Sequence, residues 1–302
     1  MLRSFVFVFL CALFSESAYT QMQQIAEWRF GINAGVSFTS GSPVDVNTCY
    51  INTPEGSASI SDLNGNLLFY TDGYYVFDRQ DLMMPNGWSL TGSGIAAQNA
   101  LIVPAPGNAN QYYLFCMSNW TDASTELRYS IIDMTLNNSY GDITATKNVL
   151  VNSNTSEQLT ATYAANGTDI WIMIHEKNNQ NFCAYLLTPS GLNTTPVVSN
   201  VGMNYDGWNR FGSLRFSHNC NKIVSALGGQ PSISTETVQL LDFNNNTGVV
   251  SNPVTLGTFT TIPFAYSAEF SPDDSKLYVV NFNSGQVYQF NLQENHFLLM
   301  VL

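Results

Sequence analysis

Residues that could perform nucleophilic or acid–base chemistry are scarce in this sequence. It has three histidines, His175, His218 and His296, and no two of them stand at a metal-binding spacing. It has no Gly-x-Ser-x-Gly motif, no glycine-rich phosphate loop and no dinucleotide-binding fingerprint. Nucleophilic catalysis needs a histidine within reach of a serine or cysteine. We therefore expect a non-catalytic protein that uses neither a metal nor another cofactor.

Side chains suited to stacking and hydrogen bonding are more plentiful. Tryptophan offers a large contact area at low entropic cost, which suits recognition of a sugar ring. The candidate ligand-binding residues are Glu55, Asp72, Tyr74, Trp88, Gln98, Trp120, Glu157, Trp208 and Arg210. A competing interpretation is that these tryptophans cap interfaces between structural units and that the acids are solvated. Trp28 and Trp171 are excluded from the set, because alternation within strands predicts that both belong to the core.

The elements that would position these residues are repeated hairpins. Each pairs two apolar segments across a polar turn, and five occur, at 58–70, 100–116, 161–174, 214–226 and 268–280. A third apolar segment follows each hairpin, and the centres of the first four, Val76, Ile131, Leu186 and Leu241, are 55 residues apart. More polar fourth strands follow at 142–151, 195–201 and 249–256.

This period predicts an all-β fold, a β-propeller of four-stranded antiparallel blades with about five blades present. A two-sheet sandwich would have similar turns but would not produce the period. In such a blade, the loops between strands two and three share one face with the blade-to-blade loops. The candidate residues lie on that face, whereas the first hairpin turn of each blade lies on the other.

The two ends of the repeat predict how the ring closes. The fifth unit lacks a clear fourth strand, and residues 294–302 form an apolar tail. The segment from Trp28 to Phe38 resembles a strand outside any hairpin, and we expect it to complete a last blade and so hide the sheet edges. We place the propeller at residues 21–293. Either the chain is an incomplete seven-bladed ring or it closes with five blades.

Composition restricts the partners. The 302 residues carry a net charge of −12 and only ten lysines and arginines, so we expect no binding to nucleic acid and none to an anionic membrane surface. Arg3 precedes an apolar run at 5–14 that small and polar residues follow. Residues 1–20 are therefore predicted to be a secretory signal, with cleavage after Ala18 or Thr20 and no membrane insertion of the mature chain. The mature protein is expected in the periplasm, at the cell surface or outside the cell.

Cysteine usage leaves two outcomes open. Without Cys11, four cysteines remain, Cys49, Cys116, Cys183 and Cys220, and their spacing matches no zinc motif. An exported chain could pair them in any of three ways. However, Cys116 and Cys183 stand inside apolar strand segments, where a buried free thiol is the commoner state.

Several motifs, taken in order, resemble one family. They are Trp28-x-Phe-Gly-x-x-Ala-Gly-x-x-Phe38, the segment from Gly56 to Gly73, Met84-Pro-Asn-Gly87, the segments Ala100–Asn108 and Leu127–Met134, and the segment from Phe270 to Tyr278. Together they are similar to the N-terminal propeller of secreted Bacteroidetes proteins of the gliding-motility-associated, type IX sorting-domain group. The resemblance covers residues 28–293. It implies about seven blades, followed by Ig-like modules and a C-terminal sorting domain, and this chain departs from that pattern by ending near a fifth blade. It carries over no catalytic residue.

The function predicted from the sequence is that of an exported, non-catalytic binding propeller for a glycan or a protein. One alternative is a metal-dependent, lactonase-like hydrolase with Glu55, Glu157 and His175 as ligands. Another is a structural or defunct fragment with no ligand, which would aggregate through an open sheet edge.

Overall fold

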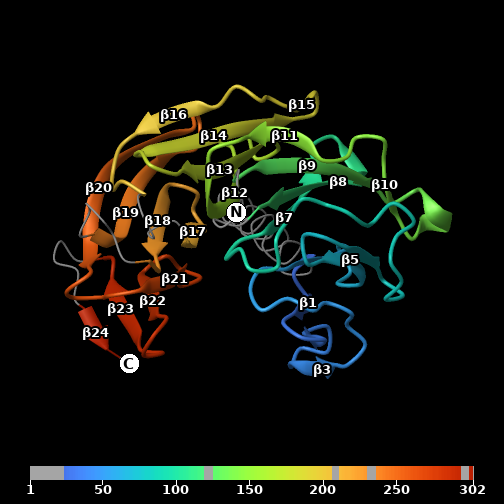
Figure 1. The fold of residues 1–302 in the computed structure, drawn as a ribbon, viewed down its shortest axis with the longest axis horizontal. Coiled ribbons are helices and arrows are strands. Elements are labelled where there is room, and N and C mark those ends of the chain that lie inside the picture. Colours follow the sequence, from blue (N-terminus) through green and yellow to red (C-terminus); the bar gives the residue numbers. More distant parts are fainter. Residues whose placement is uncertain (1–23, 119–124, 206–210, 230–235, 294–298, 302) are drawn as a thin grey trace, which may run out of the picture.

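The computed structural model describes residues 24–118, 125–205, 211–229, 236–293 and 299–301. These residues form antiparallel sheets whose first strands face a common centre, as the propeller prediction requires (Figure 1). Five of the sheets are the predicted blades, and a smaller sheet precedes them. The five predicted hairpins are confirmed as the first two strands of the five blades.

The first three blades do not have four strands each: the first has three, and the second and third have five. The first blade has β4 (Ala58–Ser61), β5 (Leu67–Thr71) and β6 (Val76–Asp78). The second has β7 (Ala100–Ala105), β8 (Asn108–Met117), β9 (Leu127–Asp133), β10 (Asp142–Ile143) and β11 (Val149–Asn152), with a 3-10 turn at Asn137–Ser139. The third has β12 (Thr155–Tyr163), β13 (Ile170–Glu176), β14 (Asn181–Thr188), β15 (Gly191–Leu192) and β16 (Val197–Asn200).

The last two blades are four-stranded sheets with their strands in sequence order. The fourth has β17 (Gly212–Phe216), β18 (Lys222–Leu227), β19 (Glu236–Asn244) and β20 (Val249–Thr258). The fifth has β21 (Ala265–Phe270), β22 (Lys276–Asn281), β23 (Val287–Asn291) and β24 (Leu299–Val301). We expected the apolar tail to form no strand, but β24 pairs with β23, with Tyr288 opposite Val301, and supplies the fourth strand.

The N-terminal segment differs from its prediction. Trp28–Phe38 is not a single strand that completes a last blade. It forms a hairpin of β1 (Glu27–Phe30) and β2 (Ala34–Ser37), and β3 (Val44–Val46) pairs with β2. The turn can form because Gly31 adopts a φ of 62°, a value that glycine tolerates without strain. This sheet and the fifth blade lie at the two ends of the arc in Figure 1.

The core lies between adjacent blades. Phe115 of the second blade packs in one cluster with Ile172 and Tyr185 of the third. Leu240 of the fourth packs similarly with Phe270 of the fifth. Burying each such side chain contributes about 1.5–3 kcal/mol, so contacts between blades, rather than a single central core, hold the structure together.

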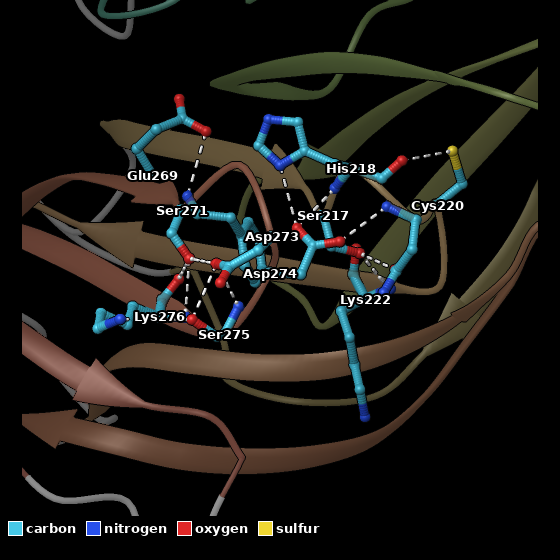
Figure 2. Close-up of polar contacts among 12 residues, drawn as sticks. Ser217, His218, Cys220, Lys222, Glu269, Ser271, Asp273, Asp274, Ser275 and Lys276 are labelled. Carbon is cyan, nitrogen blue, oxygen red and sulfur yellow. Dashed lines mark hydrogen bonds and ion pairs between the residues drawn. The ribbon is translucent and has the colours of Figure 1, made fainter. Parts of the chain in front are cut away.

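Adjacent hairpin turns are also joined by polar contacts (Figure 2). Asp274, in the turn after β21, accepts hydrogen bonds from the backbone nitrogens of His218 (2.8 Å) and Asn219 (2.8 Å) in the turn after β17. Its carboxylate also contacts the His218 Nδ1 at 3.0 Å. The neighbouring Asp273 accepts from Ser271 and Ser275 within its own turn. These turns therefore fix the register of the strands and the relative position of two blades.

Candidate functional site

The nine predicted site residues do not gather at one place. Trp120, Trp208 and Arg210 lie outside the described residues. The other six fall into three groups, which lie at the centre of the ring, at the turn after β5, and along the outer edge of the first blade.

Gln98 belongs to the central group and is buried. Its Oε1 accepts from the backbone nitrogens of Leu214 (2.8 Å) and Leu159 (3.2 Å), and its Nε2 donates to the Leu214 carbonyl oxygen (3.2 Å). One side chain from the second blade therefore ties the innermost strands of the third and fourth blades. Its hydrogen-bonding capacity is used for structure.

Glu157 and its neighbour Gln158 have similar roles. The Glu157 carboxylate is buried and accepts from the Ala97 nitrogen at 2.9 Å. Gln158 donates to the carbonyl oxygens of Ser213 (3.1 Å) and Ala226 (3.0 Å) and accepts from the Tyr205 hydroxyl (2.5 Å). These side chains thus form a polar network that joins the second, third and fourth blades near their innermost strands.

Glu55 stands just before the first blade and contacts the fifth. The Tyr266 hydroxyl, on β21, donates to the Glu55 carboxylate at 2.8 Å. Partial burial raises the pKa of Glu55, and the hydrogen bond from Tyr266 opposes that shift. Burial together with the adjacent carboxylate raises the pKa of Tyr266 well above its ordinary value. Both groups are therefore held in a contact between the first and fifth blades.

Asp72 and Tyr74 lie at the turn after β5. The Asp72 carboxylate accepts from the backbone nitrogens of Tyr74 (2.9 Å) and Tyr75 (2.7 Å), an arrangement typical of a side chain that stabilises its own turn. The Tyr74 ring is half-exposed and packs edge-on against Tyr75. Both tyrosines are therefore presented to solvent, whereas Asp72 is buried.

Trp88 lies on the outer side of the first blade, in a segment that hydrogen-bonds along β6 through Val76 and Gly87. Its ring is 53% exposed, and the Lys147 ammonium of the second blade lies 5.0 Å from the ring centroid. Lys147 also donates to the Trp88 carbonyl oxygen at 2.7 Å. This contact with the second blade agrees with the competing interpretation, in which a tryptophan caps an interface between structural units.

The alternative metal site is not assembled. Within the described part of the chain, no group of three metal-ligating side chains lies close enough to hold an ion. His175 is fully buried, its ring stacks on Tyr205 with centroids 3.4 Å apart, and its Nδ1 contacts the Glu176 carbonyl oxygen at 2.6 Å. Burial lowers the pKa of His175 to about 3. The Glu55 carboxylate accepts from the Tyr266 hydroxyl, and the Glu157 carboxylate accepts from the Ala97 nitrogen.

The four cysteines in the described part of the chain are free thiols, which decides between the two outcomes left open. Cys49, Cys116 and Cys183 are buried, and Cys220 is partly exposed. Burial raises the pKa of Cys116 and of Cys183 to about 12, so both stay protonated and unreactive at neutral pH. The Cys220 thiol contacts the carbonyl oxygen of His218 at 3.6 Å, while the His218 ring is directed to Asp274 (Figure 2).

A cavity of about 530 Å³ lies at the axis of the ring. We call it the axial cavity. Three blades contribute to its lining, through residues 57–59 of the first, 100–102 of the second and Arg215 of the fourth. The remaining lining residues are Trp28, Arg29 and Phe30 of β1 and Ile25, which precedes that strand. Arg215 follows Leu214, whose backbone is bound by Gln98, so the cavity lies directly beside the polar network. Its size is in the range of small-ligand sites.

Trp28 is the residue that the sequence reasoning missed. We expected it in the core, whereas Trp171, expected there too, is indeed buried. The Trp28 ring is 47% exposed beside the axial cavity. Its Nε1 donates to the Ile25 carbonyl oxygen at 2.8 Å, and it packs edge-on against Phe38 with centroids 5.0 Å apart. The ring is therefore fixed in orientation while one side remains accessible.

A second cavity, of about 350 Å³, adjoins the first on the hairpin-turn side of the ring. We call it the turn cavity, and it lies between the ends of β12 and β17, with Tyr163, Phe216 and His218 among its lining residues. Arg215 lines both cavities, which places its side chain at their junction. Both cavities lie apart from the loop face on which the sequence placed the site.

No described helix is long and apolar enough to span a membrane. The predicted signal at residues 1–20 falls outside the described part of the chain.

No protein-family model matches the chain, and no curated protein is similar to it in sequence. Solved structures do share its fold. The periplasmic gluconolactonase PpgL of Pseudomonas aeruginosa aligns with a TM-score of 0.56 at 13% identity, over 89% of this chain and 79% of that one. A Bacteroides uniformis protein provisionally assigned as a 6-phosphogluconolactonase aligns at 0.52 and 12% identity, over 91% and 80%. A functionally unknown protein of Desulfotomaculum acetoxidans aligns at 0.51 and 13% identity, over 92% and 86%. The chain therefore has a lactonase-like β-propeller fold.

Proposed function

We propose that this protein is an exported, non-catalytic propeller that binds a glycan in the axial cavity. The observation that carries the proposal is the Trp28 ring, half-exposed beside that cavity and held by Ile25 and Phe38. A flat aromatic surface of fixed orientation suits the apolar face of a sugar ring, because little conformational entropy is lost on binding. The hydroxyls of Ser57 and Ser59 donate to the carbonyl oxygens of Arg29 (3.0 Å) and Glu27 (2.7 Å), so they hold β1, which carries Trp28, against the first blade.

A binding role is supported over hydrolysis by the state of the described histidines. His175 is buried against Tyr205, and His218 is engaged by Asp274. Neither is among the residues that line the axial cavity, which would have to hold a general base for the cavity to act as a hydrolase site. The acidic net charge and the predicted signal at 1–20 are consistent with an exported protein that binds no nucleic acid.

The test compares two half-exposed tryptophans. Protein recovered from the culture medium, with an N-terminus expected at Tyr19 or Gln21, is applied to an array of neutral and acidic oligosaccharides. The Trp28→Ala variant is expected to bind the retained oligosaccharide about 10-fold more weakly, since loss of one aromatic contact costs about 0.5–1.5 kcal/mol beyond lost area. Isothermal titration calorimetry gives the two dissociation constants.

The matched control is Trp88→Ala, which removes an equally exposed ring from the outer edge of the first blade. It should bind as the wild type does. If Trp88→Ala weakens binding and Trp28→Ala does not, the glycan does not occupy the axial cavity. Thermal unfolding of both variants checks that neither change acts through the fold.

A further inference from the structure

Arg215 places a positive charge at the junction of the two cavities, and its side chain makes no contact with the polar network described above. Arg215, near the end of β17, lines both the axial and the turn cavity. No aspartate or glutamate lines either cavity. The chain has only ten lysines and arginines against 22 acidic residues, so a cavity wall with arginine and without carboxylates stands apart from the overall composition.

The Arg215 guanidinium is only partly engaged. Its Nε contacts Oε2 of Glu269, on β21, at 3.2 Å, and both side chains are substantially exposed. A guanidinium has five donors, and this contact uses the one on Nε, so both terminal nitrogens can still donate. Two such donors match the two oxygens of a carboxylate. An exposed ion pair of this kind contributes little to stability, so a ligand carboxylate can replace it at small cost.

The other cation near the axial cavity is already committed elsewhere. Arg29 alternates with Trp28 and Phe30 along β1, so its side chain leaves the opposite face of the strand. Its Nη1 donates to Glu27 (2.8 Å) and to the Trp28 carbonyl oxygen (3.0 Å), and its guanidinium lies over the Tyr70 ring. Arg215 is therefore the cation offered to a ligand in the axial cavity.

We propose that the ligand is an acidic oligosaccharide in which the carboxylate of a uronic acid pairs with the terminal nitrogens of Arg215, while the same sugar packs against Trp28. This inference rests on the proposed function and names its ligand class. The turn cavity, which also reaches Arg215, accommodates the next unit of the oligosaccharide, and its partly apolar lining of Val103, Ile170 and Phe216 suits the face of a sugar ring.

The experiment uses three pairs of tetrasaccharides, of galacturonic, glucuronic and mannuronic acid, each with its carboxyl-reduced neutral counterpart. Calorimetric titrations of the full chain are made at physiological ionic strength, where long-range repulsion from the net negative charge is screened beyond about 8 Å. At least one acidic tetramer is expected to bind about 10-fold or more tightly than its neutral counterpart, because hydrogen bonds to charged groups are the stronger class.

Two variants locate the effect. Arg215→Gln should bind the acidic and the neutral tetramer of that pair equally, at the affinity of the neutral one. Arg79→Gln, which removes the same charge from an exposed position beside Tyr140, should keep the full preference. Glu269→Gln removes the carboxylate that competes for Arg215, so the acidic tetramer should bind more tightly than it does to the wild type.

The titrations distinguish failure of the acidic-ligand inference from failure of the proposed glycan site. Equal binding of acidic and neutral tetramers that is lost in Trp28→Ala overturns the acidic ligand and keeps the glycan site. A preference for the acidic tetramer that persists in Arg215→Gln also overturns the inference. If none of the six tetramers binds while the array retains another oligosaccharide, the inference is overturned and the glycan site is kept. If Trp28→Ala binds every retained oligosaccharide as the wild type does, both the function and the inference are overturned.

Discussion

Replacing Gln158 by leucine is expected to lower the free energy of unfolding by about 4 kcal/mol. The change leaves the carbonyl oxygens of Ser213 and Ala226 without the Gln158 donor and the Tyr205 hydroxyl without the Gln158 acceptor. The Tyr205 hydroxyl keeps its contact with the Ser225 hydroxyl, but each of the two buried carbonyl oxygens that loses its donor costs about 1–3 kcal/mol. Leucine has nearly the same volume, so the loss comes from hydrogen bonding rather than from a cavity. Equilibrium unfolding in urea measures the difference.

The matched control is Gln80→Leu, which places the same change at an exposed position of the first blade. Its effect should stay within about 0.5 kcal/mol, as for most surface substitutions. A loss smaller than 1 kcal/mol in Gln158→Leu would contradict the role of this network in joining the blades.

The protein is expected to lose about 2 kcal/mol of stability through His175 as the pH falls from 7.5 to 5. Burial lowers the pKa of His175 to about 3 in the folded state, whereas an unfolded histidine titrates near 6.5. Below pH 6.5 the unfolded chain therefore binds a proton that the folded chain does not, so falling pH favours unfolding. The stabilisation is complete above this window and is progressively lost as the pH falls toward 3.

His175→Phe keeps a ring against Tyr205 but removes the titrating group, so its stability should change about 2 kcal/mol less than that of the wild type over the same range. His218→Gln, at the exposed histidine contacting Asp274, is the control and should keep the acid sensitivity of the wild type. Unfolding curves in urea at five pH values provide the comparison. Parallel pH profiles for the wild type and His175→Phe would show that His175 is not the group responsible.

The fold could be predicted because its signals are local and repeated. Each hairpin carries its own turn chemistry, such as the Asp62 side chain that accepts from the backbone nitrogens of Asn64 and Asn66. The 55-residue period then identifies the blade as the unit. The apolar tail was harder to interpret, because β24 acquires its role from pairing with β23 rather than from a turn of its own.

The site could not be predicted in the same way, as Trp28 illustrates. Alternation along β1 suggested that its aromatic residues face the core, but the structure buries Arg29, which is 7% exposed, and leaves Trp28 and Phe30 exposed. Arg29 can be buried because Glu27 balances its charge and Tyr70 covers it. Glu27 lies two residues away on the same strand, and Tyr70 lies on β5. The alternation of residues along β1 does not reveal either partner.

Gln98 and Glu157 show the opposite difficulty. We expected both just before innermost strands, where propeller loops often bind ligands, but only Gln98 precedes its strand, because Glu157 lies within β12. The spacing between those strands is set by packing over the whole ring, and here it brings Gln98 within 2.8 Å of the Leu214 nitrogen. Whether such a side chain meets a ligand or a neighbouring strand depends on that distance, which the local sequence does not determine.

A crystal structure of the protein with the oligosaccharide that it binds most tightly would show whether the axial cavity holds the glycan. Our account predicts a sugar ring against Trp28 in the axial cavity, beside Arg215. Sugar bound instead on the loop face, at Tyr74 and the turn of Asp72, or at the outer Trp88, with the axial cavity free of sugar, would contradict it.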